Sequence, residues 1–158
     1  MKRGIKITIG IFIGIFTILG LLIAILIGVA AISGGKYDKS SKEFVDTIIP
    51  KIISEWDYSI FIEFSHPDMP SSVSREIFEN RIVLPIKNQL GNFISYDSSE
   101  GEATIRNING KTTIDAKYSS RVTFENGNAV ITVELLFIDE NWVLTNFNIR
   151  SNELELAN

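Results

Sequence analysis

The segment from Phe124 to Ser151 constrains the fold most, because apolar and polar residues alternate along almost its whole length. One stretch has an apolar residue at every second position: Ala129, Ile131, Val133, Leu135 and Phe137. Successive side chains of a β-strand point to opposite faces. This period therefore predicts a strand with one buried face and one wet face, as in an antiparallel sheet covered on one side.

The alternation loses step once near the end of the segment. Trp142 and Leu144 are even-numbered, whereas Phe147 and Ile149 are odd-numbered. One extra residue near Thr145-Asn146 would keep all four on the same face, as a β-bulge does, and would bend the strand. The alternative is a final strand buried on both faces. We favour the bulge, which predicts a curved sheet.

Turn residues divide this half of the chain into strands. Asn109-Gly110 and Asn126-Gly127 are typical of two-residue hairpin turns, and Asp139-Glu140-Asn141 indicates a slightly longer one. Between these turns we expect four strands, at residues 102–108, 112–125, 128–138 and 142–151.

The preceding residues follow the period of helices. Ser40-Ser41-Lys42-Glu43 is typical of a capping box, and apolar residues recur at three- and four-residue spacing from Phe44 to Phe64. Pro50 predicts a kink in this helix, or the meeting point of two helices. A second helix is expected to begin at Ser71, Ser72 or Ser74 and to end near Leu90, with Gly91 as the residue that follows its cap.

A long apolar segment precedes this domain. Residues 7–32 contain no charged residue, and about 20 apolar residues suffice to span a bilayer. We therefore expect a cytoplasmic tail at 1–6, a transmembrane signal-anchor at 7–32, a linker at 33–39 and an extracytoplasmic domain at 40–158. A cleaved signal peptide, cut near Val29-Ala30-Ala31, is the alternative.

The expected fold class is therefore α+β: an N-terminal transmembrane helix, then two helices packed on a curved four-stranded antiparallel sheet. All 19 acidic residues follow the apolar segment, against 12 of the 15 Lys and Arg, so the domain has a net charge of 12 − 19 = −7. Such a domain repels phosphates on average, and we expect no nucleic-acid partner. The chain contains no cysteine, which excludes disulfides and thiolate metal sites.

Two helices followed by a long meander resemble the nuclear transport factor 2-like (cystatin-like) superfamily, in particular its small membrane-anchored bacterial members. The final strand carries the resemblance, with its turn and the positions Trp142, Leu144, Phe147, Ile149 and Ser151. The resemblance implies a cystatin-like fold at roughly residues 40–151 and a single-pass protein of the bacterial inner (cytoplasmic) membrane. The architecture is also similar to inner-membrane assembly subunits of type IV secretion systems and to assembly factors of respiratory oxidases.

Enzymes of this superfamily line a cone between sheet and helices with polar side chains. The resemblance therefore implies four candidate pocket residues: Trp56, Tyr58, Tyr118 and Ser120. Ordinary core packing is the preferred explanation of the tyrosines, because a half-buried tyrosine can extend its hydroxyl to solvent.

Nothing in the sequence assigns a catalytic residue, a metal site or a cofactor. His66 is the sole histidine and lies between Ser65 and Pro67 in an expected loop, where a capping role is commoner than catalysis. Phosphate-binding and nucleophile-elbow motifs are absent from the sequence.

Two functional hypotheses remain. The first is a non-enzymatic interaction or assembly module, whose partner is another membrane or extracytoplasmic protein or a second copy of the chain. Its candidate partner surface is the wet sheet face, represented by Lys117, Arg121, Thr132 and Glu134. The alternative is small-molecule binding or isomerase-like activity in the cone. We favour the first.

Overall fold

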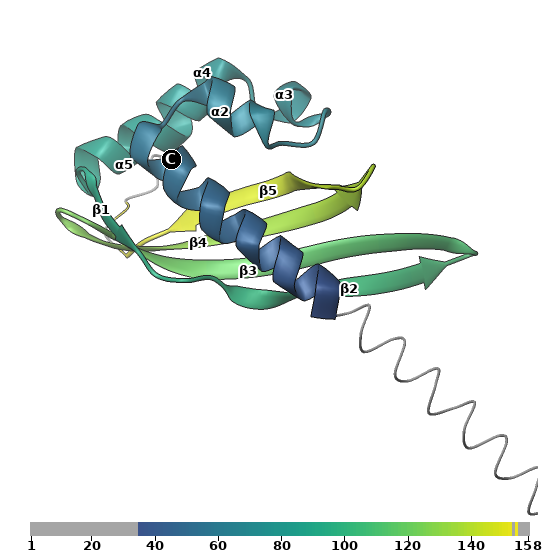
Figure 1. The fold of residues 1–158 in the computed structure, drawn as a ribbon. Helices are drawn as coiled ribbons and strands as arrows, with labels where there is room; N and C mark the ends of the chain where they lie inside the picture. The colour runs from purple at the N-terminus through teal and green to yellow at the C-terminus, as the bar shows by residue number, and fades with distance from the viewer. Residues whose placement is uncertain (1–34, 153, 155–158) are drawn as a thin grey trace, which may run out of the picture. The chain divides into compact units, whose positions relative to one another are not determined.

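The chain folds as an α+β domain in which one antiparallel sheet carries helices on a single face (Figure 1). The computed structural model describes residues 35–152 and residue 154. Tyr37 and the residues after it form one compact unit. The expected tail at 1–6 and the expected anchor at 7–32 lie outside the described residues.

The sheet has five strands, and β3 is its organising strand. The strands are β1 (Phe93–Tyr96), β2 (Glu100–Ile108), β3 (Lys111–Phe124), β4 (Gly127–Ile138) and β5 (Asn141–Arg150). On one edge β3 pairs with β4, which in turn pairs with β5. On its other edge β3 pairs first with β2 and then, near its end, with β1. Thus β1 and β2 lie end to end along one neighbour.

The prediction of a four-stranded sheet is wrong, because β1 was missed. Only four residues long, β1 is too short to reveal a period of two, and both its middle residues are exposed. A short polar connection, 97–99, separates it from β2. The backbone N–H of Asp97 still donates to the carbonyl of Arg121 on β3, so the chain stays beside the sheet across the break.

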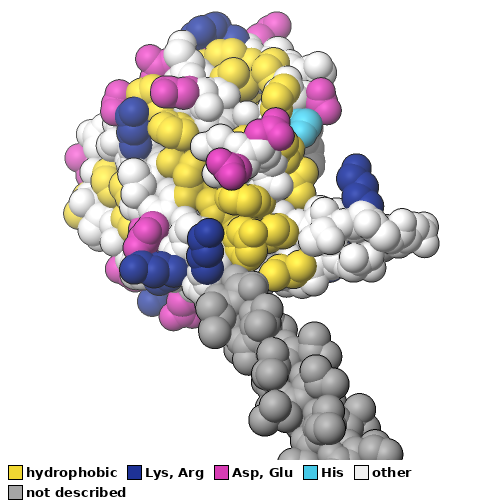
Figure 2. Space-filling model, turned by 45° about the vertical axis from the view of Figure 1, so that its right-hand side comes forward, with side chains coloured by type: hydrophobic (Ala, Val, Ile, Leu, Met, Phe, Trp, Pro, Cys, Tyr) yellow, Lys and Arg dark blue, Asp and Glu magenta, His cyan; other side chains and the backbone are white. Residues whose placement is uncertain are grey.

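The hairpin turns fall close to their predicted places. Asn109 and Gly110 both have positive φ, 53° and 79°, as a tight hairpin turn requires. The next turn is centred on Glu125-Asn126, one residue earlier than predicted, because Phe124 pairs with Gly127. The β2–β3 hairpin extends beyond the helices (Figure 1), and its tip is largely polar (Figure 2).

The predicted bulge in the last strand is confirmed. Leu135 pairs with Leu144 and Glu134 pairs with Asn146, which leaves Thr145 as the extra residue. The Thr145 hydroxyl donates to the Glu134 carbonyl at 3.0 Å. Beyond the bulge, Phe147 is again directed to the core, where its ring lies 5.8 Å from that of Phe61.

The first helix occupies residues 35–55 of the described chain and passes through Pro50 without a break. The predicted capping box is wrong, since residues 40–43 lie inside this helix, and residues expected in the linker form its first described turn. The helix ends at Trp56, whose φ of 52° turns the chain. Asp57 then caps α2 (Tyr58–Glu63), accepting the N–H of Ser59.

The second helical region is more divided than predicted. It comprises α3 (Met69–Ser72), α4 (Arg75–Ile77), the π-helical turn η1 (Phe78–Val83) and α5 (Leu84–Gln89). Ser74 is the N-cap of α4, and Gly91 follows the Leu90 cap with φ 78°, as predicted. The wider η1 turn immediately precedes Pro85, whose ring would clash with a regular helical turn. After this turn the helix buries Ile86, which is 2% exposed, and leaves Leu84 51% exposed.

The core lies between the first helix and the covered face of the sheet. The helix contributes Val45, Ile48, Ile49, Ile52 and Ile53, each at most 1% exposed. Opposite lie Tyr118, Val122, Ile131, Val133, Leu135 and Leu144, each also at most 1% exposed. Burying one such side chain stabilises the fold by about 1.5–3 kcal/mol.

The fold class predicted from the sequence therefore needs correction. The α+β class is observed, but the sheet has five strands and the helical part has more than two segments. Within residues 35–152 and 154, no helix combines the length and apolar character needed to cross a bilayer.

Gly101→Ala should destabilise the domain. Gly101 pairs with Tyr118, and a Cβ at this position would collide with the Lys117 carbonyl oxygen and lie 2.8 Å from the Tyr118 Cα. We expect the free energy of unfolding of the full chain in urea to fall by about 1–3 kcal/mol. Gly35→Ala is the matched control, since nothing lies within 4 Å of its Cβ. Equal stability of the two variants would contradict this description of β2.

Candidate functional site

Tyr118 lies on the covered face of the sheet and is 1% exposed. Its hydroxyl is 2.8 Å from the Ser41 Oγ and donates to the Asp38 carbonyl at 3.1 Å. Burial raises the pKa of Tyr118. The hydroxyl therefore joins the sheet to the start of the first helix, and its hydrogen bonds are made within the domain.

Ser120 belongs to a second group of polar contacts, which we call the polar clamp: Lys42, Asp46, Tyr96, Ser99 and Ser120. Asp46 on the first helix accepts the Tyr96 hydroxyl at 2.9 Å and the Ser99 backbone N–H at 2.8 Å. Lys42 forms a salt bridge with the same carboxylate at 2.9 Å. The Ser120 hydroxyl donates to Tyr96 at 2.9 Å. The clamp attaches the break between β1 and β2 to the helix.

The titration properties of the clamp fit a structural role. Burial by itself raises the pKa of Asp46, but hydrogen bonds from Ser99, Lys42 and Tyr96 outweigh it and lower this pKa to about 2. Burial and the bond to Asp46 raise the pKa of Tyr96 to about 12, although the Ser120 bond opposes them. At neutral pH Asp46 is thus a carboxylate and Tyr96 a neutral hydroxyl. Neither pKa lies near 7, where a general acid or base works best.

The other two pocket candidates lie at the far end of the first helix. Trp56 follows that helix, whereas Tyr118 bonds to Ser41, so a helical rise of about 22 Å separates the two places. The Tyr58 hydroxyl donates to the Val73 carbonyl at 2.9 Å, and its ring packs 5.7 Å from that of Phe78. The structure thus does not bring the four candidate residues together.

His66 helps to hold a loop. The ring Nδ1 of His66 accepts the backbone N–H of Asp68 at 3.1 Å. The backbone N–H of His66 donates to the Leu144 carbonyl at 2.8 Å. In the part of the chain that the structure describes, no three His, Asp or Glu side chains gather as a metal site would require.

The face of the sheet without helices, which we call the outer face, is the candidate partner surface (Figure 1). It consists of alternate residues from four strands: Glu100, Glu102, Thr104, Arg106, Asp115, Lys117, Ser119, Arg121, Val130, Thr132, Glu134, Leu136, Val143, Asn146, Asn148 and Arg150. All of them are exposed or half-buried, whereas their neighbours along β3 and β4 are largely buried. The four predicted partner-surface residues, Lys117, Arg121, Thr132 and Glu134, lie together on this face.

Charges on the middle of the outer face are mostly paired across strands. Lys117 and Glu134 are direct neighbours, with Nζ and Oε1 2.9 Å apart. Arg106 and Asp115 form a second ion pair at 2.7 Å. Hydrogen bonding with Lys117 lowers the pKa of Glu134, which keeps its carboxylate charged.

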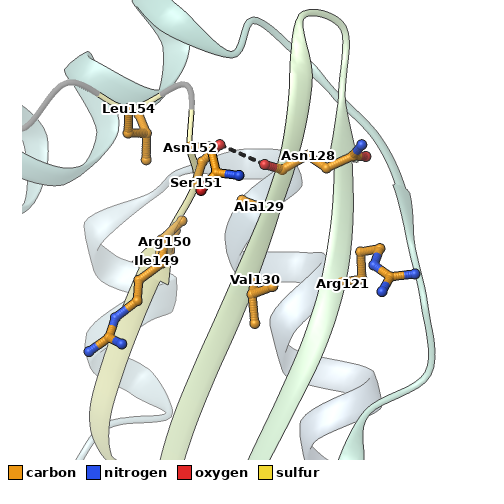
Figure 3. A pocket seen from close by; sticks show the side chains of 9 residues that line it. All are labelled: Arg121, Asn128, Ala129, Val130, Ile149, Arg150, Ser151, Asn152 and Leu154. Atoms are coloured by element: carbon orange, nitrogen blue, oxygen red, sulfur yellow. Dashed lines mark hydrogen bonds between the residues drawn. The ribbon is translucent and has the colours of Figure 1, made fainter.

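An open hollow of about 700 Å³ lies at one end of the outer face (Figure 3). Its described lining is Arg121, Asn128, Ala129, Val130, Ile149, Arg150, Ser151, Asn152 and Leu154. The Ser151 hydroxyl donates to the Asn128 carbonyl at 2.6 Å and closes one end. Val130 and Arg150 were not predicted as surface residues, although the predicted bulge turns Asn146, Asn148 and Arg150 to the wet face.

Comparisons with protein-family models, with curated proteins and with solved structures gave no match to this chain. The resemblance to the nuclear transport factor 2-like superfamily therefore stays a prediction.

Asp46→Asn should destabilise the domain in a pH-dependent way. The pKa of Asp46 is lower in the folded chain than its ordinary value of 3.8, so its contribution is complete above that value and is lost as the pH falls toward 2. At pH 7 we expect the free energy of unfolding to fall by about 2 kcal/mol, because charge-assisted hydrogen bonds are removed. The difference from the unsubstituted chain should shrink between pH 4 and 2.

Urea unfolding of the full chain across this pH range measures the difference. Glu43→Gln is the control, since Glu43 lies on the same helix outside the clamp and forms only an exposed ion pair with Lys39 at 3.9 Å, so its substitution should change stability little at any of these pH values. A constant difference between Asp46→Asn and the unsubstituted chain from pH 7 to 2 would show that the carboxylate does not hold the clamp.

Proposed function

We propose that the domain is a non-enzymatic interaction module and that a partner protein docks on the outer face of its sheet. The observation that carries the proposal is the one-sided covering of the sheet: every helix of the described chain packs on the other face (Figure 1). An antiparallel sheet tolerates one wet face, so exposure alone does not require a partner. The arrangement of side chains on that face supplies the further support.

The outer face has the mixed character of a non-obligate interface. Its ion pairs hold charged side chains in fixed places, while Val130 and Leu136 add exposed or half-buried apolar surface. Such interfaces are about as apolar as the rest of a protein surface and use polar groups for specificity. The rigid strands below hold these groups in register.

The interior gives less support to the alternative of a small-molecule pocket. The first helix and the sheet fill the space between them with side chains that are almost completely buried. Tyr118 and Ser120 hydrogen-bond within the domain, and Trp56 and Tyr58 pack elsewhere. A ligand would have to displace core side chains in order to enter.

The proposal concerns residues 37–152 and does not depend on where the protein resides. A location at the bacterial inner membrane stays a prediction from the sequence, because residues 7–32 lie outside the described chain. If that prediction holds, the partner is a membrane or extracytoplasmic protein.

Photocrosslinking in intact source cells tests the proposal. A photoreactive phenylalanine analogue placed at Thr132, in the middle of the outer face, should give one discrete protein adduct of the full chain. The same analogue at Glu55 or Glu79, two exposed positions on the helices, should not give that adduct. Comparing the adducts formed from these three positions distinguishes docking on the sheet from random collision.

A substitution on the same face supplies the specificity control. Ser119→Glu, directly across from Thr132, places an extra carboxylate on the outer face and should reduce the adduct at least about fivefold while the chain stays folded. An adduct that forms equally from Glu55, Glu79 and Thr132, or that is unaffected by Ser119→Glu, would contradict docking on the outer face.

A further inference from the structure

We propose that the docking segment of the partner is acidic and that its carboxylates bind Arg121 and Arg150, on either side of Val130. This inference rests on the proposed function and adds the chemistry of the partner. The relevant surface is the hollow at the end of the outer face (Figure 3).

The register places the two arginines in one row. Arg121 on β3 pairs with Val130 on β4, and Val130 pairs with Arg150 on β5. Two interstrand spacings separate the arginine Cα atoms, a distance of about 10 Å. Their guanidinium groups point away from each other, with Val130 between them (Figure 3). In this arrangement each guanidinium group would bind a separate carboxylate, and an apolar side chain of the partner would contact Val130 between them.

These arginines differ from the other basic residues of the outer face. Arg106 and Lys117 each hold a carboxylate of the same sheet within 3 Å. Among the described residues, neither Arg121 nor Arg150 has an ion-pair partner, although Arg150 does donate to the Asn148 side chain at 3.2 Å. With respect to the described residues, two guanidinium groups can therefore bind an incoming anion, in a domain with more acids than bases.

The rest of the hollow favours a peptide segment. Its described lining contains no acidic residue, and Val130 supplies the apolar surface on the outer face, whereas Ala129 and Ile149 lie on the covered side of their strands. Val130 is 45% exposed and presents its side chain on the outer face between the two arginines. An acidic segment with an apolar residue between its carboxylates would match this surface.

The charge around Arg121 gives the segment a direction. Asp97 and Glu100 line a smaller hollow beside Arg121, on the β2 side. Arg121 lines that hollow too, and these acids would repel a carboxylate on its β2 side, whereas the β4 and β5 side presents Arg150, Asn148 and Thr132. The segment should therefore reach Arg121 from the β4 side and continue over β4 and β5.

The same observations disfavour other occupants. Attraction to anionic lipids usually needs clusters of about 4–8 basic residues, and nucleic acids need several phosphate contacts, whereas this row has two arginines in an acidic domain. A second copy docked symmetrically about Val130 would bring arginines against arginines. A planar guanidinium matches a carboxylate in two parallel hydrogen bonds, which favours an acidic protein segment.

Fluorescence anisotropy with the full chain tests the inference. The probes are a labelled peptide with two glutamates around a valine and its counterpart with glutamines. We expect the glutamate peptide to bind at least about tenfold more tightly, and this preference to disappear in the Arg121→Gln/Arg150→Gln double variant. Arg81→Gln/Lys87→Gln makes the same charge change at exposed helix positions and should leave the preference intact.

Equal binding of both peptides, or an unchanged preference in the Arg121/Arg150 double variant, would overturn the inference. Flotation with phosphatidylserine vesicles that depends on the two arginines, in place of peptide binding, would also overturn it. So would peptide binding that appears only after Glu153→Gln/Glu155→Gln, which would identify the chain's own tail as the occupant. If the Thr132 crosslink persists in any of these cases, the proposed function stands. If the crosslink is also absent, both fail.

Discussion

The contact between the first helix and the sheet determines most of the structure. Five aliphatic residues of the helix, Val45, Ile48, Ile49, Ile52 and Ile53, recur at the spacing of a helical stripe and lie almost completely buried. The covered face of the sheet carries the buried set of large apolar side chains that receives this stripe, whereas the outer face carries only scattered ones such as Val130 and Leu136. The other face must therefore meet water or a partner, and this asymmetry is why the outer face is the surface to which function is assigned.

Polar contacts set the register of that packing. Apolar contacts are not directional, so a helix can slide on a sheet unless specific bonds stop it. At its start, Ser41 meets the Tyr118 hydroxyl and Asp38 accepts the N–H of Ala103 on β2. One turn later, Asp46 holds the break between β1 and β2. The clamp thus serves the architecture, whereas Arg121 and Arg150, which have no ion-pair partner among the described residues, lie at the end of the outer face.

The long strands could be predicted because each contains several alternating apolar and polar residues between recognisable turns. The bulge could be predicted because the apolar residues of the last strand change once from even to odd positions. Other features left no such signal. The break at Trp56 uses a positive φ at an aromatic residue, where a turn would usually have glycine. The π-helical turn before Pro85 could not be predicted, because a proline in a helical segment can end, kink or widen the helix. The candidate pocket was inferred from a resemblance, and its residues separate because hydroxyl partners and ring contacts, which sequence spacing does not encode, decide where each one packs.

The central claim is that one face of the sheet is sealed by the first helix and the other is open. The chain has no cysteine, so single cysteines can be introduced along β4 and their rates of maleimide labelling compared in the folded full chain. The structure predicts fast labelling at Val130 and Thr132 and labelling at least about tenfold slower at Ile131 and Val133, whose side chains are 1% exposed. Equal rates along the strand, or fast labelling at Ile131 and Val133, would contradict the account.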